Sequence, residues 1–363
     1  MAEDIYVKLG ERLNKNFMRM PLGEPVLAFL RKVFTEEHAA IGANLPMGAH
    51  SLSHLSRVLH RDPNELYAIF DKMADKGLIF IHVNGSGEKE YSLPPFFPGI
   101  VEFQSMRGTE TEEDIDIAHT IRKMMAYLNE LGKDLFNNPD AANKIIPAAL
   151  RTLTVERELP QDSTTILPFE QVSAIIEKET SFATVYCHCR HNEKLTGNPC
   201  AIPNVPERTC FYFGEVADFM IEREFAKRIT KEECMGILKK CEEAGLVHNI
   251  NNYLGRTLVL CNCCSCCCDF LVRMKKYRGL RSIAPSNFIV SVDQENCIGC
   301  GTCISRCQME ALSLEDDTVS LTESYCIGCG NCVSTCPEDA LKMIRHSDHK
   351  PIELKFEFPG LGL

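Results

Sequence analysis

The sequence predicts a multidomain α+β protein. Three observations predict this class. The first third of the chain shows helical periodicity followed by a hairpin signal, ten cysteines crowd into two short segments of the middle, and eight more form two copies of one pattern near the C-terminus. We expect five parts: an N-terminal domain over residues 1–105, a helical connector over 106–180, a helical cysteine-rich domain over 181–283, a small α+β domain over 284–347 and a tail over 348–363.

The composition sets limits on the class of protein. A chain of 363 residues is long enough for several ordinary cores. Because its N-terminus lacks an apolar signal region and no stretch approaches roughly 18 consecutive apolar residues, we expect a soluble, cytoplasmic protein with no transmembrane segment. Twenty cysteines in a reducing compartment indicate thiolates bound to metal, and not disulfides. The net charge of -11 disfavours attraction to nucleic acid or anionic membranes.

Residues 24–93 predict a winged-helix-like domain. A helix from Glu24 to about Phe34, a second around SLSHLSRVL and a third after the turn at Asp62-Pro63 precede a hairpin, LIFIHV-NGSG-EKEYSL, with glycine at its turn. The third helix has one apolar stripe at helical spacing: Leu66, Ile69, Phe70 and Met73. Three helices followed by a wing is the order of that fold.

A winged helix that binds DNA exposes basic and amide side chains on its third helix. Here the polar positions of that helix include Glu65, Asp71 and Asp75 against only Lys72 and Lys76. This is a poor face for DNA, so nucleic acid is an unlikely partner. We expect the domain to dock a protein.

The connector and the middle domain contain well-signalled helices. An amphipathic helix starts in the acidic segment TEEDIDIAHTIRKMMAYLNELGKDLF, and its methionine pair is expected in the core. A shorter helix is expected over PFEQVSAIIEKET. Residues 230–245 form a third, with Thr230 and Glu233 as a capping box. Cys234 and Cys241 lie two turns apart on this helix, which favours ordinary core thiols over ligands.

The other ten middle cysteines predict metal binding. Six of them fall in the eight residues of CNCCSCCC, and neighbouring side chains there point in different directions, so they cannot all be buried apolar thiols. Ten thiolates suffice for one or two further [4Fe-4S] clusters, or for a cluster and a zinc ion, with an unusual non-cubane cluster as a further alternative. Because a Cys-x-Cys pair holds only one corner of a cubane, we expect residues 187–210 and 261–268 to face each other. The ten are Cys187, Cys189, Cys200, Cys210, Cys261, Cys263, Cys264, Cys266, Cys267 and Cys268.

Three polar residues accompany the first cysteine pair. His188 and His191 are candidates for iron ligands, but with so many thiolates available a hydrogen-bonding role is favoured. Arg190 is expected to donate hydrogen bonds to cluster sulfur or to offset its negative charge.

The C-terminal cysteines form an internal duplication. CIGCGTCISRCQMEAL and CIGCGNCVSTCPEDAL are identical at 10 of 16 positions, and each follows a strand-like run. Zinc sites show two cysteine pairs, and disulfides need an oxidising compartment, so neither explains this spacing. Gln308 stands where the second copy has Pro337, which predicts an altered loop or potential with no lost cluster.

Residues 285–346 resemble the bacterial two-cluster ferredoxins, whose fold pairs short strands with short helices and whose activity is one-electron transfer. In that motif the fourth cysteine of each run binds the other cluster. The resemblance implies two [4Fe-4S] clusters, one bound by Cys297, Cys300, Cys303 and Cys336 and the other by Cys326, Cys329, Cys332 and Cys307.

The chain as a whole, with CHCRH, ITKEECMGILKKCEEAGLVHN and CNCCSCCC before the duplication, looks like iron-sulfur proteins of anaerobic bacteria and archaea. This implies electron transfer. We expect the electron-relay subunit of an anaerobic oxidoreductase, with a redox protein or another oxidoreductase subunit as its partner.

The N-terminal domain and the tail, with Phe356, Phe358 and Leu361, are expected to dock that partner or a second copy of the chain. Nucleotide motifs such as GxGxxG after a strand or a P-loop are missing from the sequence, so an enzyme acting alone is disfavoured. Two alternatives remain: a redox-sensing transcription regulator, and an oxidoreductase with a catalytic middle cluster that keeps an open iron position.

Overall fold

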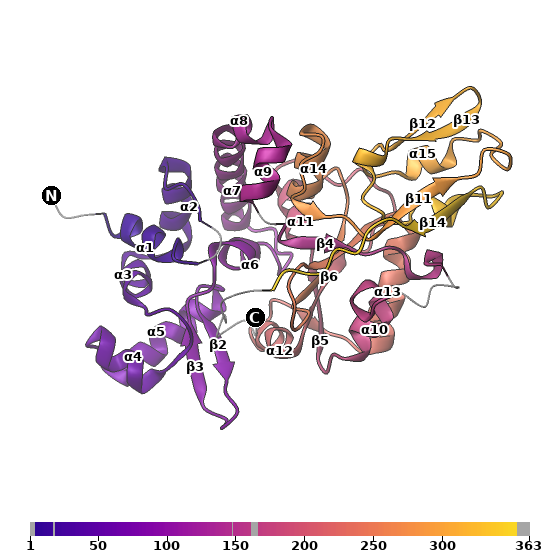
Figure 1. Cartoon of the computed structure of the whole chain (residues 1–363). Helices are drawn as coiled ribbons and strands as arrows, with labels where there is room; N and C mark the ends of the chain where they lie inside the picture. Colours follow the sequence, from indigo (N-terminus) through magenta and orange to yellow (C-terminus); the bar gives the residue numbers. More distant parts are fainter. Residues whose placement is uncertain (1–3, 17–18, 147, 161–165, 354–363) are drawn as a thin grey trace.

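The computed structural model describes residues 4–16, 19–146, 148–160 and 166–353. It is a mixed α+β chain, with a helical N-terminal part, a central seven-stranded sheet and two small two-stranded sheets near the C-terminus (Figure 1). Within these ranges, none of the helices combines the length and the apolar character needed to cross a membrane.

The N-terminal part has the predicted helices and hairpin, with additional helices among them. Asp62 accepts hydrogen bonds from the backbone N–H groups of Asn64 and Glu65 and starts α5. Short α1 and α3 were not expected from the sequence. The winged-helix interpretation of this order stays a prediction. The elements are α1 (Ile5–Leu13), α2 (Glu24–Val33), α3 (Glu36–Asn44), β1 (His50–Ser51), α4 (Leu52–Leu59), α5 (Pro63–Asp75), β2 (Phe80–Val83) and β3 (Lys89–Ser92), with strand order β1-β3-β2.

The long amphipathic helix α7 (Glu112–Leu131) packs on α2. Its Ile117, Ile121 and Met124 are buried in the same core as the N-terminal helices, as the apolar period of the segment predicts. The helix therefore belongs by packing to the N-terminal part, although the sequence assigned it to a connector. Around it lie the irregular turn η1 (Phe96–Ile100), α6 (Val101–Phe103), α8 (Lys133–Phe136) and α9 (Pro139–Ile145).

A seven-stranded sheet forms the centre of the molecule, where the sequence predicted a helical domain. Its order is β10-β4-β8-β9-β6-β5-β7, and every pair is antiparallel except β10 with β4. The strands are β4 (Leu150–Thr152), β5 (Phe182–Tyr186), β6 (Arg208–Phe213), β7 (Lys227–Arg228), β8 (Val247–Asn251), β9 (Val259–Cys263) and β10 (Ile283–Ala284).

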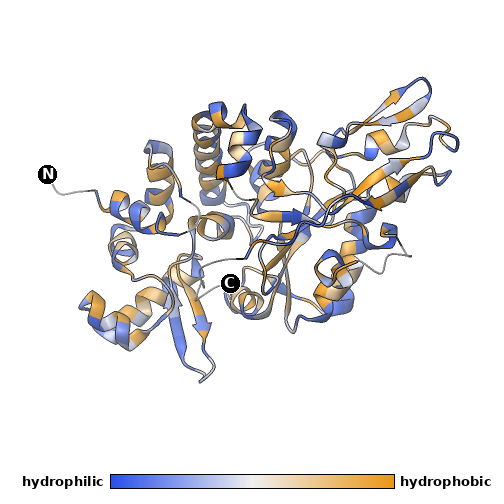
Figure 2. Cartoon of the chain, viewed as in Figure 1, coloured by the Kyte–Doolittle hydropathy of each residue, from blue (hydrophilic) through white to orange (hydrophobic). Residues whose placement is uncertain are grey.

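The two faces of this sheet differ in character. On one face Phe211 and Leu260 pack against Leu238 of α13 (Lys231–Glu243) and against α10 (Val172–Glu177). Because side chains alternate along a strand, the neighbouring Cys210 and Cys261 point to the opposite face. Figure 2 shows hydrophobic and hydrophilic residues interspersed along the strands and helices. The remaining elements here are η2 (Glu156–Glu158), η3 (Pro168–Glu170), α11 (His188–Leu195), α12 (Gly214–Glu222) and α14 (Asp269–Lys276).

The duplication is visible in the backbone of the C-terminal part. Gly299 and Gly328 occupy the same place in the two copies and have φ angles of 68° and 71°. A Cβ on Gly299 would lie 2.3 Å from the Asp317 carbonyl oxygen, and one on Gly328 would lie 1.9 Å from that of Phe288. Both positions require glycine. The elements are β11 (Phe288–Val292), α15 (Thr302–Arg306), β12 (Leu312–Glu315), β13 (Thr318–Leu321), η4 (Glu323–Tyr325), η5 (Val333–Thr335) and β14 (Leu341–Arg345), with β11 paired to β14 and β12 to β13.

The C-terminal part is joined to segments next to the central sheet by backbone and side-chain hydrogen bonds. The Val155 N–H donates to the Cys329 carbonyl at 2.9 Å, and the Asn331 amide donates to the carbonyls of Gly245 and Leu246 at 3.1 Å. At the start of the tail, the Ile352 N–H donates to the Asn252 carbonyl. The predicted docking residues Phe356, Phe358 and Leu361 lie outside the described residues.

Candidate metal centres

Two small cavities in the C-terminal part are each lined by four cysteines. One is lined by Cys297, Cys300, Cys303 and Cys336, and the other by Cys307, Cys326, Cys329 and Cys332. These are the two sets implied by the ferredoxin resemblance, with the fourth cysteine of each run exchanged. Among the described residues, no three of these eight sulfurs lie within 4.8 Å of one another. Such an open arrangement fits a [4Fe-4S] cubane, in which each thiolate binds a different iron.

The C-terminal thiols differ in the hydrogen-bond donors that lie near their sulfur atoms. The Ala311 N–H donates to the Cys307 sulfur at 3.2 Å, and the Thr302 hydroxyl lies 3.5 Å from the Cys300 sulfur. The Thr302 hydroxyl and N–H lower the pKa of the exposed Cys300, whereas burial raises the pKa of Cys329 to about 12. Because donors to sulfur and burial both tune a cluster, the two C-terminal centres are expected to differ in potential.

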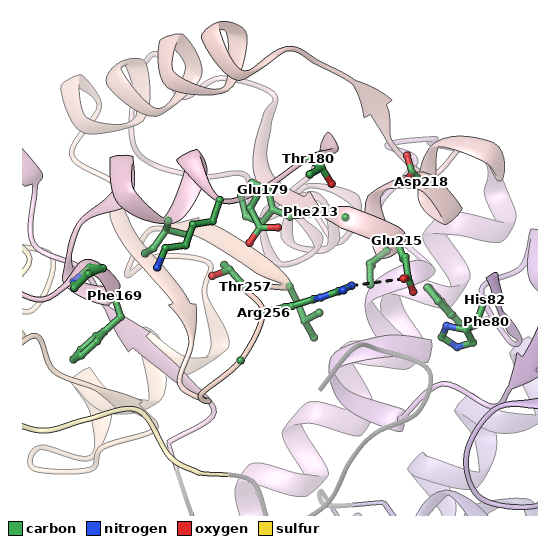
Figure 3. A pocket seen from close by; sticks show the side chains of 17 residues that line it. Phe80, His82, Phe169, Glu179, Thr180, Phe213, Glu215, Asp218, Arg256 and Thr257 are labelled. Atoms are coloured by element: carbon green, nitrogen blue, oxygen red, sulfur yellow. Dashed lines mark ion pairs between the residues drawn. The ribbon is translucent and has the colours of Figure 1, made fainter. Parts of the chain in front are cut away.

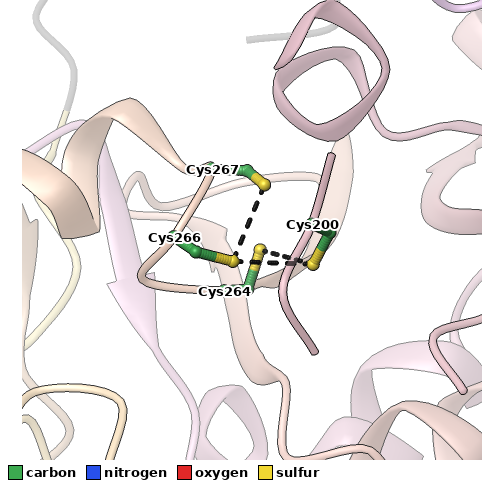
Figure 4. A group of neighbouring side chains, drawn as sticks. All are labelled: Cys200, Cys264, Cys266 and Cys267. Carbon is green, nitrogen blue, oxygen red and sulfur yellow. Dashed lines mark hydrogen bonds between the residues drawn. The ribbon is translucent and has the colours of Figure 1, made fainter. Parts of the chain in front are cut away.

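A compact group of four thiols lies at the turn after β9 (Figure 4). Cys264, Cys266 and Cys267 come from this turn and Cys200 from the loop that follows α11; we call them the four-thiol group. The Cys200 sulfur lies 3.6 Å from that of Cys264 and 3.5 Å from that of Cys266, and the sulfurs of Cys266 and Cys267 are 3.7 Å apart. All four sulfurs lie within 4.8 Å of one another.

A zinc ion with Zn–S bonds of about 2.3 Å in tetrahedral geometry places its thiolates about 3.8 Å apart. Three sulfur pairs of the four-thiol group, at 3.5–3.7 Å, are close to that spacing, and all four sulfurs lie within 4.8 Å of one another. Hydrogen bonds from Cys264 and Cys267 lower the pKa of Cys200 to about 4, which favours the thiolate that a metal requires.

The other six middle cysteines form a closed ring of neighbouring thiols. Cys187 interacts with Cys189 and Cys210, and Cys268 interacts with Cys189 and Cys263. Cys261 closes the circle by interacting with Cys210 and Cys263. We call these six the thiol ring: Cys187, Cys189, Cys268, Cys263, Cys261 and Cys210, in order around it. Four are buried and two, Cys189 and Cys261, are half-buried.

The sheet register explains why the thiol ring closes. Phe211 of β6 pairs with Leu260 of β9, so the next pair along places Cys210 beside Cys261 on one face. Cys263 follows Cys261 by two residues and shares that face. The segments 187–210 and 261–268 therefore face each other across β6 and β9, as the sequence predicted.

Two helix N-termini point at the thiol ring. Cys187 is the N-cap of α11 and Cys268 is the N-cap of α14. Hydrogen bonds from the neighbouring thiols lower the pKa of both cysteines, and the positive end of each helix acts in the same direction. Both cysteines are thus predisposed to bind metal as thiolates.

Arg190 lies between the two groups of thiols. Its buried guanidinium donates to the Asn262 carbonyl at 2.9 Å and to the Cys264 sulfur at 3.8 Å, and it contacts the Thr209 hydroxyl. Burial acts to lower the pKa of Arg190, but the charges of nearby cysteines, Cys187 and Cys264 among them, raise it overall. The charge-compensating role expected for this arginine is consistent with these contacts.

The remaining candidates take less direct roles. His191 bonds through Nε2 to the Thr109 carbonyl at 2.8 Å, which is the favoured hydrogen-bonding role. His188 is buried, its Nδ1 has no partner in the described part of the chain, and burial lowers its pKa to about 4, which favours the neutral ring. Cys234 and Cys241 lie in the core as predicted, and burial raises the pKa of each to about 12.

Gln308, which the sequence marked only as a departure from the repeat, links the middle and C-terminal parts. Its side-chain oxygen accepts from the Ser265 N–H at 2.9 Å, and its amide donates to the Gly245 carbonyl at 3.1 Å. Ser265 lies within the four-thiol group's turn, and Cys307, next to Gln308, lines the second C-terminal cavity. A proline at position 308 has no side chain that could make either bond.

The thiol ring also packs against that second cavity. Cys263 and Cys268 belong to one apolar cluster with Met309 and Ile327, and Cys307 and Cys329 pack against the same cluster. The middle and C-terminal candidate centres therefore share an apolar boundary.

A separate cavity of about 500 Å³ lies between β2 and the middle domain (Figure 3). Phe80 and His82 line it from the N-terminal part, and Glu215 and Arg256, whose charged groups are 3.6 Å apart, line it from the middle. None of its lining residues is a cysteine.

Comparison with known proteins bears on the C-terminal part alone. A family model described as a 4Fe-4S dicluster domain matches residues 290–343. Comparison with curated proteins and with solved structures gave no match. The match and the cysteine geometry together make this chain an iron-sulfur protein with a 4Fe-4S dicluster domain near its C-terminus.

Proposed function

We propose that the protein is an electron relay, the electron-transfer subunit of an anaerobic oxidoreductase, in which the dicluster domain exchanges electrons with a redox centre in the thiol ring. The observation that carries this proposal is the apolar cluster in which Cys263 and Cys268 pack with Cys307 and Cys329. Two centres separated by packed apolar side chains exchange electrons with little reorganisation of polar groups, so this contact is suited to transfer.

The order of the centres follows from their shared packing. Cys303 lines the first C-terminal cavity and Cys332 lines the second, and both belong to one apolar cluster. The second cavity in turn adjoins the thiol ring. The proposed route therefore runs from the first cluster through the second to the ring, or in reverse, one electron at a time.

The docking role of the N-terminal domain is favoured over a role in DNA binding by the contacts of α5. Asp71 and Asp75, on the helix that would enter a major groove, pair with Arg223 at 2.7 and 2.9 Å. That part of the helix is thus held against the end of α12. A redox-sensing regulator is the rival, and tight, sequence-dependent DNA binding in a gel-shift assay would favour it.

A catalytic middle cluster is disfavoured by the number of thiols. The ring offers six thiols, more than the four that a cubane binds, so a cubane there has no shortage of protein ligands. The relay proposal therefore assigns substrate chemistry to the partner.

EPR spectroscopy during a potentiometric titration of the anaerobically purified protein tests the relay. We expect a signal from the middle centre in addition to those of the two ferredoxin-type clusters, and broadening by magnetic coupling when the middle centre and the second cluster are both paramagnetic. If the middle centre gives no redox change across the range that reduces the other two, the relay proposal fails.

A further inference from the structure

We propose that the ten middle cysteines form two chemically different centres: a zinc site in the four-thiol group and a single polynuclear iron-sulfur cluster in the thiol ring. The ring's part in electron transfer rests on the function proposed above. The division into two kinds of site rests on sulfur geometry. It can be correct even if the relay proposal is wrong.

The four-thiol group converges on one point. Three of its members come from the four consecutive residues 264–267, and neighbouring Cys266 and Cys267 bring their sulfurs to 3.7 Å. A cubane spreads its thiolates over four irons, whereas one tetrahedral ion holds all four at the spacing seen here. For the same ligands Zn²⁺ binds more tightly than Fe²⁺, which favours zinc at this place.

The two C-terminal cysteine sets provide an internal comparison. They carry the cubane motif, and within the described residues neither brings three sulfurs within 4.8 Å of one another. The four-thiol group does so with all four of its sulfurs. The same chain therefore distinguishes an open set of thiols from a compact one.

The thiol ring belongs with the open sets. The register of β6 and β9 places Cys210 beside Cys261 and on the face of Cys263, yet among the described residues no three sulfurs of the ring lie within 4.8 Å of one another. A single ion cannot reach thiols arranged in this way without moving strands β6 and β9, which the sheet holds in register. A polynuclear core enclosed by the ring can bind its thiols through several irons.

On this assignment the four-thiol group has a structural role and the thiol ring has a redox role. Zinc has no redox chemistry, so the four-thiol group fixes the turn of residues 264–267 and the Cys200 loop. In that turn, the Ser265 N–H donates a hydrogen bond to Gln308 of the dicluster domain, and the Cys264 sulfur accepts one from Arg190. The zinc site would hold the ring and the dicluster domain in a constant relative position.

Metal analysis of three single variants of the full chain, purified without oxygen, tests the division. Cys266→Ser removes an exposed member of the four-thiol group, and Cys263→Ser removes a member of the thiol ring. Cys241→Ser is the matched control, because Cys241 is buried beside Cys264 and Cys267 but belongs to neither set.

We expect Cys266→Ser to lose about one zinc per chain and to keep its iron, and Cys263→Ser to lose about four irons and to keep its zinc. The control should keep both metals. Loss of iron from Cys266→Ser with zinc unchanged would overturn the assignment, as would a wild-type protein without zinc.

X-ray absorption at the zinc edge tests the zinc site in the wild-type protein, so its result does not depend on whether the variants fold. Four sulfur neighbours at about 2.3 Å are expected, and nitrogen or oxygen neighbours would contradict the site. A ring cluster that is present but redox-silent would leave this division intact and defeat only the relay.

Discussion

Arg190 is the residue whose position joins the two middle centres. It is buried, donates to the Cys264 sulfur and lies close enough to Cys187 for their charges to interact. A positive charge beside a cluster stabilises the reduced, more negative state. Arg190 should therefore raise the reduction potential of the ring cluster.

Replacement of Arg190 by Gln should lower that potential because it removes the charge and keeps a hydrogen-bond donor. A shift of about 60 mV, a tenfold change in the one-electron equilibrium, is the expected scale. EPR-monitored titration measures it. Arg190→Lys keeps the charge, so its reduction potential should stay close to that of the wild type. Equal potentials in all three proteins would show that the charge does not act on the cluster.

The sequence identified Arg190 and the cysteines by their chemistry, but it did not say how the cysteines divide. Cys264 and Cys263 are adjacent in CNCCSCCC and belong to different groups in the structure. Their separation depends on where β9 ends and the turn begins. Alternating side-chain directions separate neighbouring cysteines only where the chain is a strand. The spacing of the cysteines in the sequence does not show where that strand ends.

At the scale of elements, the turn after β9 and the segment after α15 are held together by Gln308. Gln308→Leu removes both hydrogen bonds and leaves the Ser265 N–H without that partner. We expect a loss of about 1–3 kcal/mol in the free energy of unfolding and weaker magnetic coupling between the second cluster and the ring cluster. Denaturant unfolding without oxygen and EPR measure the two effects.

Gln294→Leu is the matched control, because the Gln294 amide donates to the Val319 carbonyl within the dicluster domain. This variant should change stability without changing the coupling. Equal coupling in wild type and Gln308→Leu would mean that Gln308 does not position the two parts.

The predicted helices and the missed sheet differ in the strength of their local signals. The helix at 231–243 has a capping box and an apolar stripe, and α5 has an N-cap and proline at its start. Strands β8 and β9, VHNIN and VLCNC, are five residues each and carry asparagine and cysteine on buried positions. Their stability comes from cross-strand pairing and packing, which a single short segment does not reveal.

At the scale of the whole molecule, the predicted C-terminal cysteine sets line the two cavities because the duplicated motif encodes local geometry, and a family model matches the same region. The contact between this domain and the thiol ring joins residues far apart in sequence, such as Cys268 and Cys329. Such contacts arise only when the sheet and the dicluster domain have both folded.

The central claim is that the middle cysteines hold a further redox cluster beyond the two of the dicluster domain. Iron and acid-labile sulfide per chain, measured on anaerobically purified protein, test it most directly. With four irons per cubane-sized core, the account predicts at least about twelve irons and a comparable amount of sulfide. About eight irons, with the middle cysteines holding zinc alone or no metal, would contradict it.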